Sequence, residues 1–111
     1  GDVDGKTAII IDDMVDTAGT LTAGIKMLKD KGAKAVYASC SHGILSGPAI
    51  ERLKAAELAG FVCTNTIDQT ENQKNYPEMT VLSMAPLLAG LIHAVEENSS
   101  LSEVLAHAFD D

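Results

Sequence analysis

Basic side chains are scarce in this chain. Lysine and arginine together number 8 against 16 aspartates and glutamates, which gives a formal net charge of −8, and Arg52 is the single arginine. A surface that binds nucleic acid needs clustered lysine and arginine to displace counterions from phosphates. The charge balance therefore argues against a nucleic-acid partner. An anionic ligand would need bound cations, or cations from another segment, to offset the repulsion.

Several sequence signals are absent as well. No run of about 18 apolar residues could span a membrane, and no basic start precedes an apolar stretch as in a signal peptide. We therefore expect a soluble, cytoplasmic protein with no membrane partner. Cys40 and Cys63 match no CxxC or zinc spacing, which predicts buried free thiols. The nucleotide-binding patterns GxxxxGK[ST] and GxGxxG do not occur, so those two phosphate loops are excluded.

What is present is the pattern of a single α/β domain over residues 1–111. Apolar runs predict strands at 6–12, 35–40, 61–65 and 80–82, and helical spacing predicts helices that begin near residues 20, 48, 86 and 100. The second helix is predicted to close at Gly60, the polar segment 68–78 to be an exposed connection, and the acidic tail 110–111 to be frayed. Alternating strands and helices imply a parallel sheet, and the continuous apolar run 6–12 suits a strand covered on both faces.

The loop between the first strand and the first helix carries the chemistry. In an open parallel sheet, ligands collect where strands end and helices begin. The backbone N–H groups of residues 17–20 can form a concave nest, to which the helix adds its positive dipole end, so we expect a phosphate there. Gly19 leaves room for close approach of the backbone, and the hydroxyls of Thr17 and Thr20 add donors.

Two acids precede this loop. Ionised Asp12 and Asp13 would repel a phosphate but would accept hydrogen bonds from paired sugar hydroxyls, and phosphate plus diol describe a ribose 5-phosphate unit. The same carboxylates could instead hold Mg²⁺, directly or through water. A third interpretation makes Asp13, Asp16, Thr17 and Gly19 ordinary turn formers and a helix N-cap.

The full string 11–21, Ile-Asp-Asp-Met-Val-Asp-Thr-Ala-Gly-Thr-Leu, resembles the phosphoribosyl-pyrophosphate signature of the type I phosphoribosyltransferase fold. Three further stretches resemble the C-terminal part of the ribose-phosphate pyrophosphokinase family: residues 1–5, 41–50 and 64–67. The resemblance implies a Rossmann-like, three-layer α/β fold, with residues 1–111 forming an incomplete C-terminal domain that holds the ribose 5-phosphate site.

The resemblance also implies an activity, namely transfer of diphosphate from ATP to ribose 5-phosphate with Mg²⁺, giving 5-phosphoribosyl 1-diphosphate and AMP for nucleotide biosynthesis. By motif match, Asp16, Thr17, Ala18, Gly19 and Thr20 grip the 5-phosphate, while Asp12 and Asp13 address the ribose hydroxyls and, through water, the metal. Ala18 stands where some members have glycine. The family's catalytic lysine and arginine, its metal-binding residues and most of its ATP site, which neighbouring subunits of a homo-oligomer share, lie outside this chain.

We therefore expect no catalytic residue here and no activity from this chain alone, since Arg52 is predicted to be distant and charge on the transferring group needs cations. Two alternatives remain: a phosphoribosyltransferase that uses a nucleobase, and a non-catalytic regulatory subunit. His42 is expected to be structural, His93 and His107 to lie on the surface or face a partner, and residues 105–109 to resemble a segment of an effector site between subunits.

Overall fold

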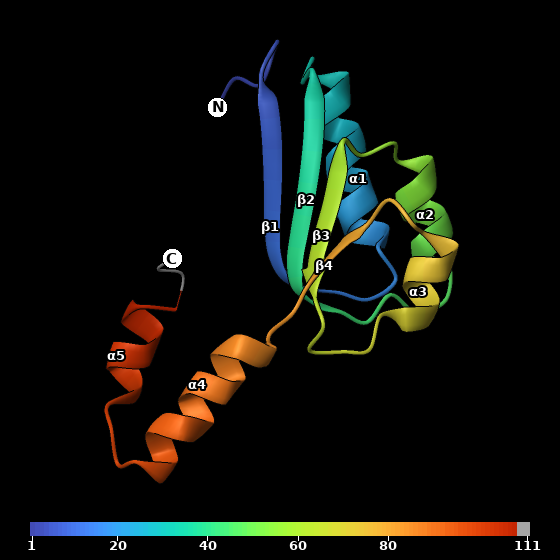
Figure 1. Cartoon of the computed structure of the whole chain (residues 1–111). Helices are drawn as coiled ribbons and strands as arrows, with labels where there is room; N and C mark the ends of the chain where they lie inside the picture. The colour runs from blue at the N-terminus through green and yellow to red at the C-terminus, as the bar shows by residue number, and fades with distance from the viewer. Residues whose placement is uncertain (109–111) are drawn as a thin grey trace.

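The computed structural model describes residues 1–108, and within them four parallel strands form one sheet in the order β1-β2-β3-β4 (Figure 1). The strands are β1 (Thr7–Val15), β2 (Ala35–Gly43), β3 (Gly60–Thr64) and β4 (Thr80–Leu82). The helices are α1 (Gly19–Asp30), α2 (Ala49–Ala55), α3 (Thr70–Asn75), α4 (Ala85–Glu96) and α5 (Leu101–Ala106). The predicted α/β fold with a parallel sheet and flanking helices is confirmed.

The core lies between the sheet and helices α1, α2 and α3. Phe61, Ile25, Leu53 and Val36 are its largest fully buried side chains. Helix α1 turns its buried residues Leu21 and Ile25 toward the sheet and ends before Gly32, whose φ of +94° is a left-handed conformation that suits glycine. This packing fixes the end of β1 relative to the start of α1, where the predicted loop lies.

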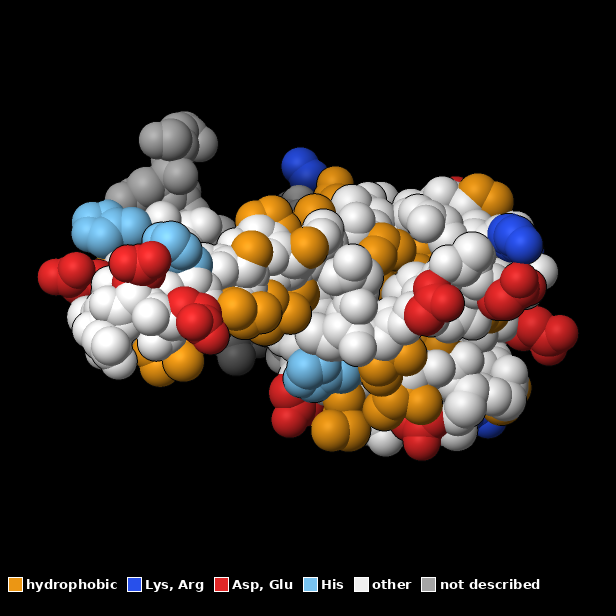
Figure 2. All heavy atoms as spheres, turned by 60° about the horizontal axis from the view of Figure 1, so that its bottom comes forward, with side chains coloured by type: hydrophobic (Ala, Val, Ile, Leu, Met, Phe, Trp, Pro, Cys, Tyr) orange, Lys and Arg blue, Asp and Glu red, His pale blue; other side chains and the backbone are white. Residues whose placement is uncertain are grey.

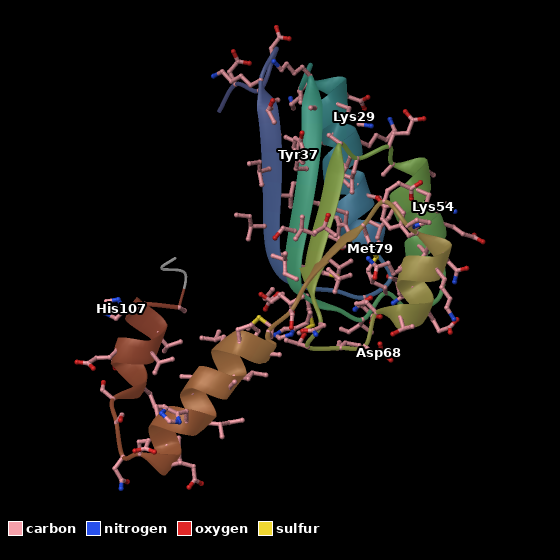
Figure 3. The ribbon with its side chains drawn as sticks, in the orientation of Figure 1. Lys29, Tyr37, Lys54, Asp68, Met79 and His107 are labelled. Atoms are coloured by element: carbon pink, nitrogen blue, oxygen red, sulfur yellow. The ribbon has the colours of Figure 1, made fainter. Side chains whose placement is uncertain are left out.

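The opposite face of the sheet is bare in the described part of the chain. Ile9 and Ile11 of β1 are 66% and 79% exposed, whereas Ala8 and Ile10 pack against the core. Figure 1 shows α1, α2 and α3 on one side of the sheet only, and Tyr37 of β2 lies on the uncovered side (Figure 3). The prediction of a strand covered on both faces is therefore wrong for residues 1–108, where the helices pack against one face of the sheet only.

Helices α4 and α5 form an arm that projects from the sheet (Figure 1). The helix predicted to begin near residue 100 is confirmed as α5, and the hydroxyl of Ser100 caps it by accepting a hydrogen bond from the Glu103 N–H at 3.3 Å. Leu88, Ile92 and Val95 of α4 are more than half exposed, and Figure 2 shows hydrophobic side chains gathered on the arm and beside it. None of the helices between residues 1 and 108 is long and apolar enough to cross a membrane. The tail 110–111, predicted to be frayed, lies outside the described residues.

Two predictions about the second half of the sheet are corrected, namely the end of α2 and the exposure of the segment 68–78. Helix α2 ends at Ala55 instead of Gly60, because Glu57 takes a left-handed φ of 54° and Gly60 already belongs to β3. The segment 68–78 is not a purely exposed connection, since it contains α3 and packs into the core. Its Gln69 is 3% exposed and donates to the Gly43 carbonyl at 2.6 Å, and Tyr76 is 6% exposed. This packing fastens the end of β2.

Candidate functional site

A hollow of about 300 Å³ lies at the carboxyl end of β1, where the chain turns into α1. Its lining comes from residues 12–21 with the exception of Asp13: Asp12, Met14, Val15, Asp16, Thr17, Ala18, Gly19, Thr20 and Leu21. Six of the seven residues predicted to bind ribose 5-phosphate are among them, and Asp13 is not. The structure therefore brings the predicted phosphate loop together around one concavity.

Helix α1 begins in this hollow without a side-chain cap. Its N-cap residue is Ala18, with φ 66° and ψ 13°, and the first turn contains no acidic residue. A left-handed residue followed by a helical one turns successive N–H groups to one side, and the first N–H groups of a helix have no carbonyl partner within it. The main-chain amides at Ala18 and Gly19 are therefore available to an anion. The alternative in which polar loop side chains cap the helix is wrong.

Two hydroxyl groups add to these amides. Thr17 and Thr20 are both exposed, and neither hydroxyl makes a hydrogen bond with another residue in the range 1–108. Each hydroxyl can donate one hydrogen bond to a phosphate oxygen. The hollow thus combines main-chain and side-chain donors for which residues 1–108 supply no acceptor.

The loop is held in place by the segment that follows β2. The N–H groups of Ile44 and Leu45 donate to the Val15 carbonyl at 3.0 and 3.1 Å, and the Ser46 N–H donates to the Asp16 carbonyl at 2.9 Å. The Ser46 hydroxyl also donates to the Asp16 carboxylate. Residues 44–46 of the stretch 41–50 therefore have a structural part in the site, because they hold the predicted phosphate loop in place from the end of the neighbouring strand.

The two acids at the end of β1 point to opposite sides of the strand. Strand β1 runs on to Val15, so successive side chains alternate between its faces, and Asp12 lines the hollow while Asp13 does not. Each carboxylate accepts a hydrogen bond at 2.8 Å from the N–H of the residue after it. Only Asp12 is placed to meet a ligand held in the hollow.

The oxygen donors around the hollow meet part of what Mg²⁺ requires. This ion takes oxygen ligands and keeps several of its waters, with one or two carboxylates and substrate oxygens completing the shell. Among residues 1–108, no three His, Cys, Asp or Glu side chains are grouped so that they could hold a metal ion. Asp12 fits a contact through water, and the described residues do not form a complete metal site.

Arg52 is the functional candidate that sequence reasoning placed wrongly. It was expected to be distant, but its Nη1 donates to the Thr17 carbonyl at 3.0 Å. A Cβ added to Gly19 would lie 3.2 Å from the same nitrogen. The two residues are 35 positions apart in sequence, and packing of α2 beside α1 brings them together. No local sequence signal could have revealed this contact.

A larger groove, of about 600 Å³, lies between α1 and α2 and shares Gly19 with the hollow. Its lysines already have partners. Lys29 donates to the carbonyls of Ala56 and Glu57 at 2.6 and 2.8 Å, and Lys26 pairs with Asp30 at 3.0 Å. We assign this groove to helix packing because its lysines are engaged with the protein, in contrast to the donors of the smaller hollow.

His42 and the cysteines have structural surroundings. His42 Nδ1 lies 2.8 Å from the Thr66 hydroxyl, and the ring does not line the hollow, which agrees with the expected structural role. Both cysteines are buried free thiols, as predicted. Burial raises the pKa of Cys40 to about 11, with the neighbouring Cys63 and Asp12 adding to the effect, and burial also raises the pKa of Cys63. Neither thiol is activated as a nucleophile.

Comparison with known proteins places the chain. A family model described as the phosphoribosyl synthetase-associated domain matches residues 1–106. The chain belongs to this family. A ribose-phosphate pyrophosphokinase from Halalkalibacterium halodurans is 52% identical over 102 residues, which make up 92% of this chain and 32% of that protein. The chloroplastic ribose-phosphate pyrophosphokinase 1 of Arabidopsis thaliana is 49% identical over 105 residues, or 94% of this chain and 26% of that protein.

A solved structure gives the same result for this member of the phosphoribosyl synthetase-associated domain family. The crystal structure of phosphoribosylpyrophosphate synthetase from Mycobacterium smegmatis matches with a TM-score of 0.85 and 48% identity, over 89% of this chain and 33% of that one. The predicted resemblance to ribose-phosphate pyrophosphokinases is confirmed. The chain spans about a third of the length of such relatives, and its correspondence to their C-terminal part stays a prediction.

Proposed function

We propose that this chain is the ribose 5-phosphate-binding part of a ribose-phosphate diphosphokinase. The observation that carries the proposal is the uncapped start of α1, where main-chain amides without an acceptor among residues 1–108 and the hydroxyls of Thr17 and Thr20 share one hollow with Asp12. The names of the relatives, ribose-phosphate pyrophosphokinase and phosphoribosylpyrophosphate synthetase, support the same reaction.

The proposed binding mode divides the ligand between two kinds of group. The 5-phosphate lies against the amides at residues 17–20, where hydrogen bonds to an anion are stronger than those between neutral groups. The Asp12 carboxylate accepts hydrogen bonds from the ribose hydroxyls, and its negative charge keeps the phosphate at the other end of the hollow. One sugar orientation is favoured, with its anomeric hydroxyl directed out of the loop.

In the proposed reaction, the oxygen of the anomeric hydroxyl forms a bond to the β-phosphorus of ATP. The bond between that phosphorus and the oxygen bridging to the α-phosphate breaks, AMP leaves with the electron pair, and the proton of the anomeric hydroxyl passes to solvent. Mg²⁺, when bound with the nucleotide, would offset charge on the phosphates, and Asp12 would contact it through water. The residues of this chain bind and orient the sugar.

The chain alone is proposed to be inactive. A transferring diphosphoryl group needs cations directed at its oxygens, and Arg52 does not line the hollow. We propose that the complete protein is cytoplasmic and forms a homo-oligomer. The cations for the diphosphoryl group and most of the ATP site would come from the rest of that protein and from neighbouring subunits.

Turnover by the complete gene product tests the reaction. Incubation with ATP, Mg²⁺ and ribose 5-phosphate, with no other subunit present, is expected to give 5-phosphoribosyl 1-diphosphate and AMP in equal amounts. Consumption of 5-phosphoribosyl 1-diphosphate with a nucleobase, in place of its synthesis, would establish a phosphoribosyltransferase. Absence of both reactions would favour a non-catalytic regulatory subunit.

The opposite directions of Asp12 and Asp13 provide a matched pair of variants for the binding site. Asp12→Asn should raise the Kd for ribose 5-phosphate about tenfold in calorimetry, because the lost interaction is a hydrogen bond to a charged group. Asp13→Asn should leave this Kd within about twofold. Equal weakening by the two substitutions would contradict the proposed placement of the sugar.

A further inference from the structure

We propose that Arg52 is a positioning residue for the phosphate loop, acting through the main-chain carbonyl of Thr17. The inference deepens the proposed function and rests on it, since it concerns how the ribose 5-phosphate site is kept in its binding geometry. Arg52 lies on α2, outside the hollow, and reaches the loop from the side of the helices. It would therefore affect the ligand without touching it.

The geometry of the peptide group carries the inference. Arg52 Nη1 donates to the Thr17 carbonyl at 3.0 Å. In a planar trans peptide the C=O and the following N–H point in opposite directions, so a carbonyl held toward Arg52 directs the Ala18 N–H away from it. Thr17 and Ala18 line the hollow, whereas Arg52 does not. The hydrogen bond thus keeps a donor, instead of a carbonyl oxygen, turned toward the phosphate.

Backbone strain at Ala18 explains why the loop needs the hydrogen bond from Arg52 to the Thr17 carbonyl. Ala18 has a φ of 66°, a left-handed conformation that a residue with a Cβ adopts at a cost of roughly 1–2 kcal/mol. A loop with such a residue tends to relax by flipping the preceding peptide, which would turn the Thr17 carbonyl into the anion site. The bond from Arg52 opposes this flip from one side, while Ser46 holds Asp16 from the other.

Because residue 19 is glycine and has no Cβ, the Arg52 guanidinium can approach the start of α1 closely. A Cβ there would lie 3.2 Å from Arg52 Nη1, which is tighter than an ordinary van der Waals contact. Glycine at this position therefore serves the approach of Arg52 as well as that of a phosphate. Arg52 is also the single arginine of a chain with a net charge of −8.

The test compares Arg52→Met with Lys54→Met in the complete gene product. Lys54 is a matched control, because it lies on the same helix and donates to a main-chain carbonyl, that of Asn75, at 3.1 Å, but at the α3 side, away from the loop (Figure 3). Arg52→Met should raise the Kd for ribose 5-phosphate about tenfold, as expected for loss of a bond from a charged donor. Lys54→Met should leave it within about twofold.

Three further readouts separate positioning from charge and from general stability. Arg52→Lys keeps a charged donor and should restore part of the lost affinity. The ratio of the Arg52→Met and wild-type Kd values should persist in about 1 M salt, where distant charges are screened. In turnover, the KM for ribose 5-phosphate should rise while the KM for ATP stays unchanged.

Wild-type affinity in Arg52→Met, equal weakening in Lys54→Met, or a ratio that falls to one in high salt would each overturn the inference. If Arg52→Met does not fold, an unchanged Kd in Arg52→Lys together with an unchanged KM would overturn it. A wild-type protein that fails to bind ribose 5-phosphate would overturn the proposed function itself, so the two failures are distinguishable.

Discussion

Ala18 allows the strained loop to be tested by a single substitution, Ala18→Gly. The residue is 4% exposed and has a φ of 66°. Glycine removes the left-handed strain, which costs alanine roughly 1–2 kcal/mol. Against this, glycine adds freedom to the unfolded chain, about 0.4–1 kcal/mol, and loses a buried methyl group, about 0.8 kcal/mol. The contributions nearly cancel, so the free energy of unfolding should change by less than about 1 kcal/mol.

Ala38→Gly is the matched control. Ala38 is 1% exposed and lies in the middle of β2, where alanine has no left-handed strain to lose. The same two costs apply without the compensating gain, so this variant should be destabilised by about 1.5 kcal/mol. Urea unfolding of the 111-residue chain at low protein concentration, followed by circular dichroism, measures both variants against wild type.

The outcome that matters is the difference between the two variants. Ala18→Gly should be more stable than Ala38→Gly by about 1–2 kcal/mol, and its affinity for ribose 5-phosphate should be preserved. An Ala18→Gly variant as unstable as Ala38→Gly would mean that residue 18 is not left-handed in solution. The nest of amides at the start of α1 would then lose its geometric basis.

Two more predictions follow from burial and exposure. Burial raises the pKa of Cys40 from its ordinary value of 9.0 to about 11, so above pH 9 the unfolded chain releases this proton first. The free energy of unfolding should therefore fall by about 2 kcal/mol between pH 9 and pH 11. Cys40→Ala should reduce that fall in urea titrations, and an unchanged dependence on pH would refute the raised pKa of Cys40. The bare sheet face should make the isolated chain self-associate. In sedimentation experiments, Ile11→Lys should reduce this self-association, while Met27→Lys, on the exposed surface of α1, should leave it unchanged. An equal reduction by the two substitutions would contradict a specific role for the sheet face.

The loop and the alternation of strands and helices along the chain could be predicted because local patterns encode them. An apolar run that ends at an acidic residue, followed by turn-forming residues and then by apolar residues at helical spacing, predicts a strand-loop-helix unit. The helix in residues 70–75 could not be recognised, because it is short and polar and has no apolar periodicity. It is held by Gln69 and Tyr76, two buried residues whose partners come from elsewhere in the chain.

Three features of the site depended on tertiary structure. Asp13 turns away from the hollow because β1 continues to Val15 instead of ending at Asp12. Arg52 reaches the loop because α2 packs beside α1. The bare face of β1 has the same apolar sequence as a strand covered on both sides, and a sequence pattern does not say which neighbours are present.

The proposed binding mode can be seen directly in a crystal structure of the complete gene product with ribose 5-phosphate. We expect the 5-phosphate to lie against the main-chain N–H groups at Ala18 and Gly19, the Thr17 carbonyl to be turned toward Arg52, and the ribose hydroxyls to contact Asp12. A sugar phosphate bound elsewhere, with the turn between β1 and α1 unoccupied, would contradict it.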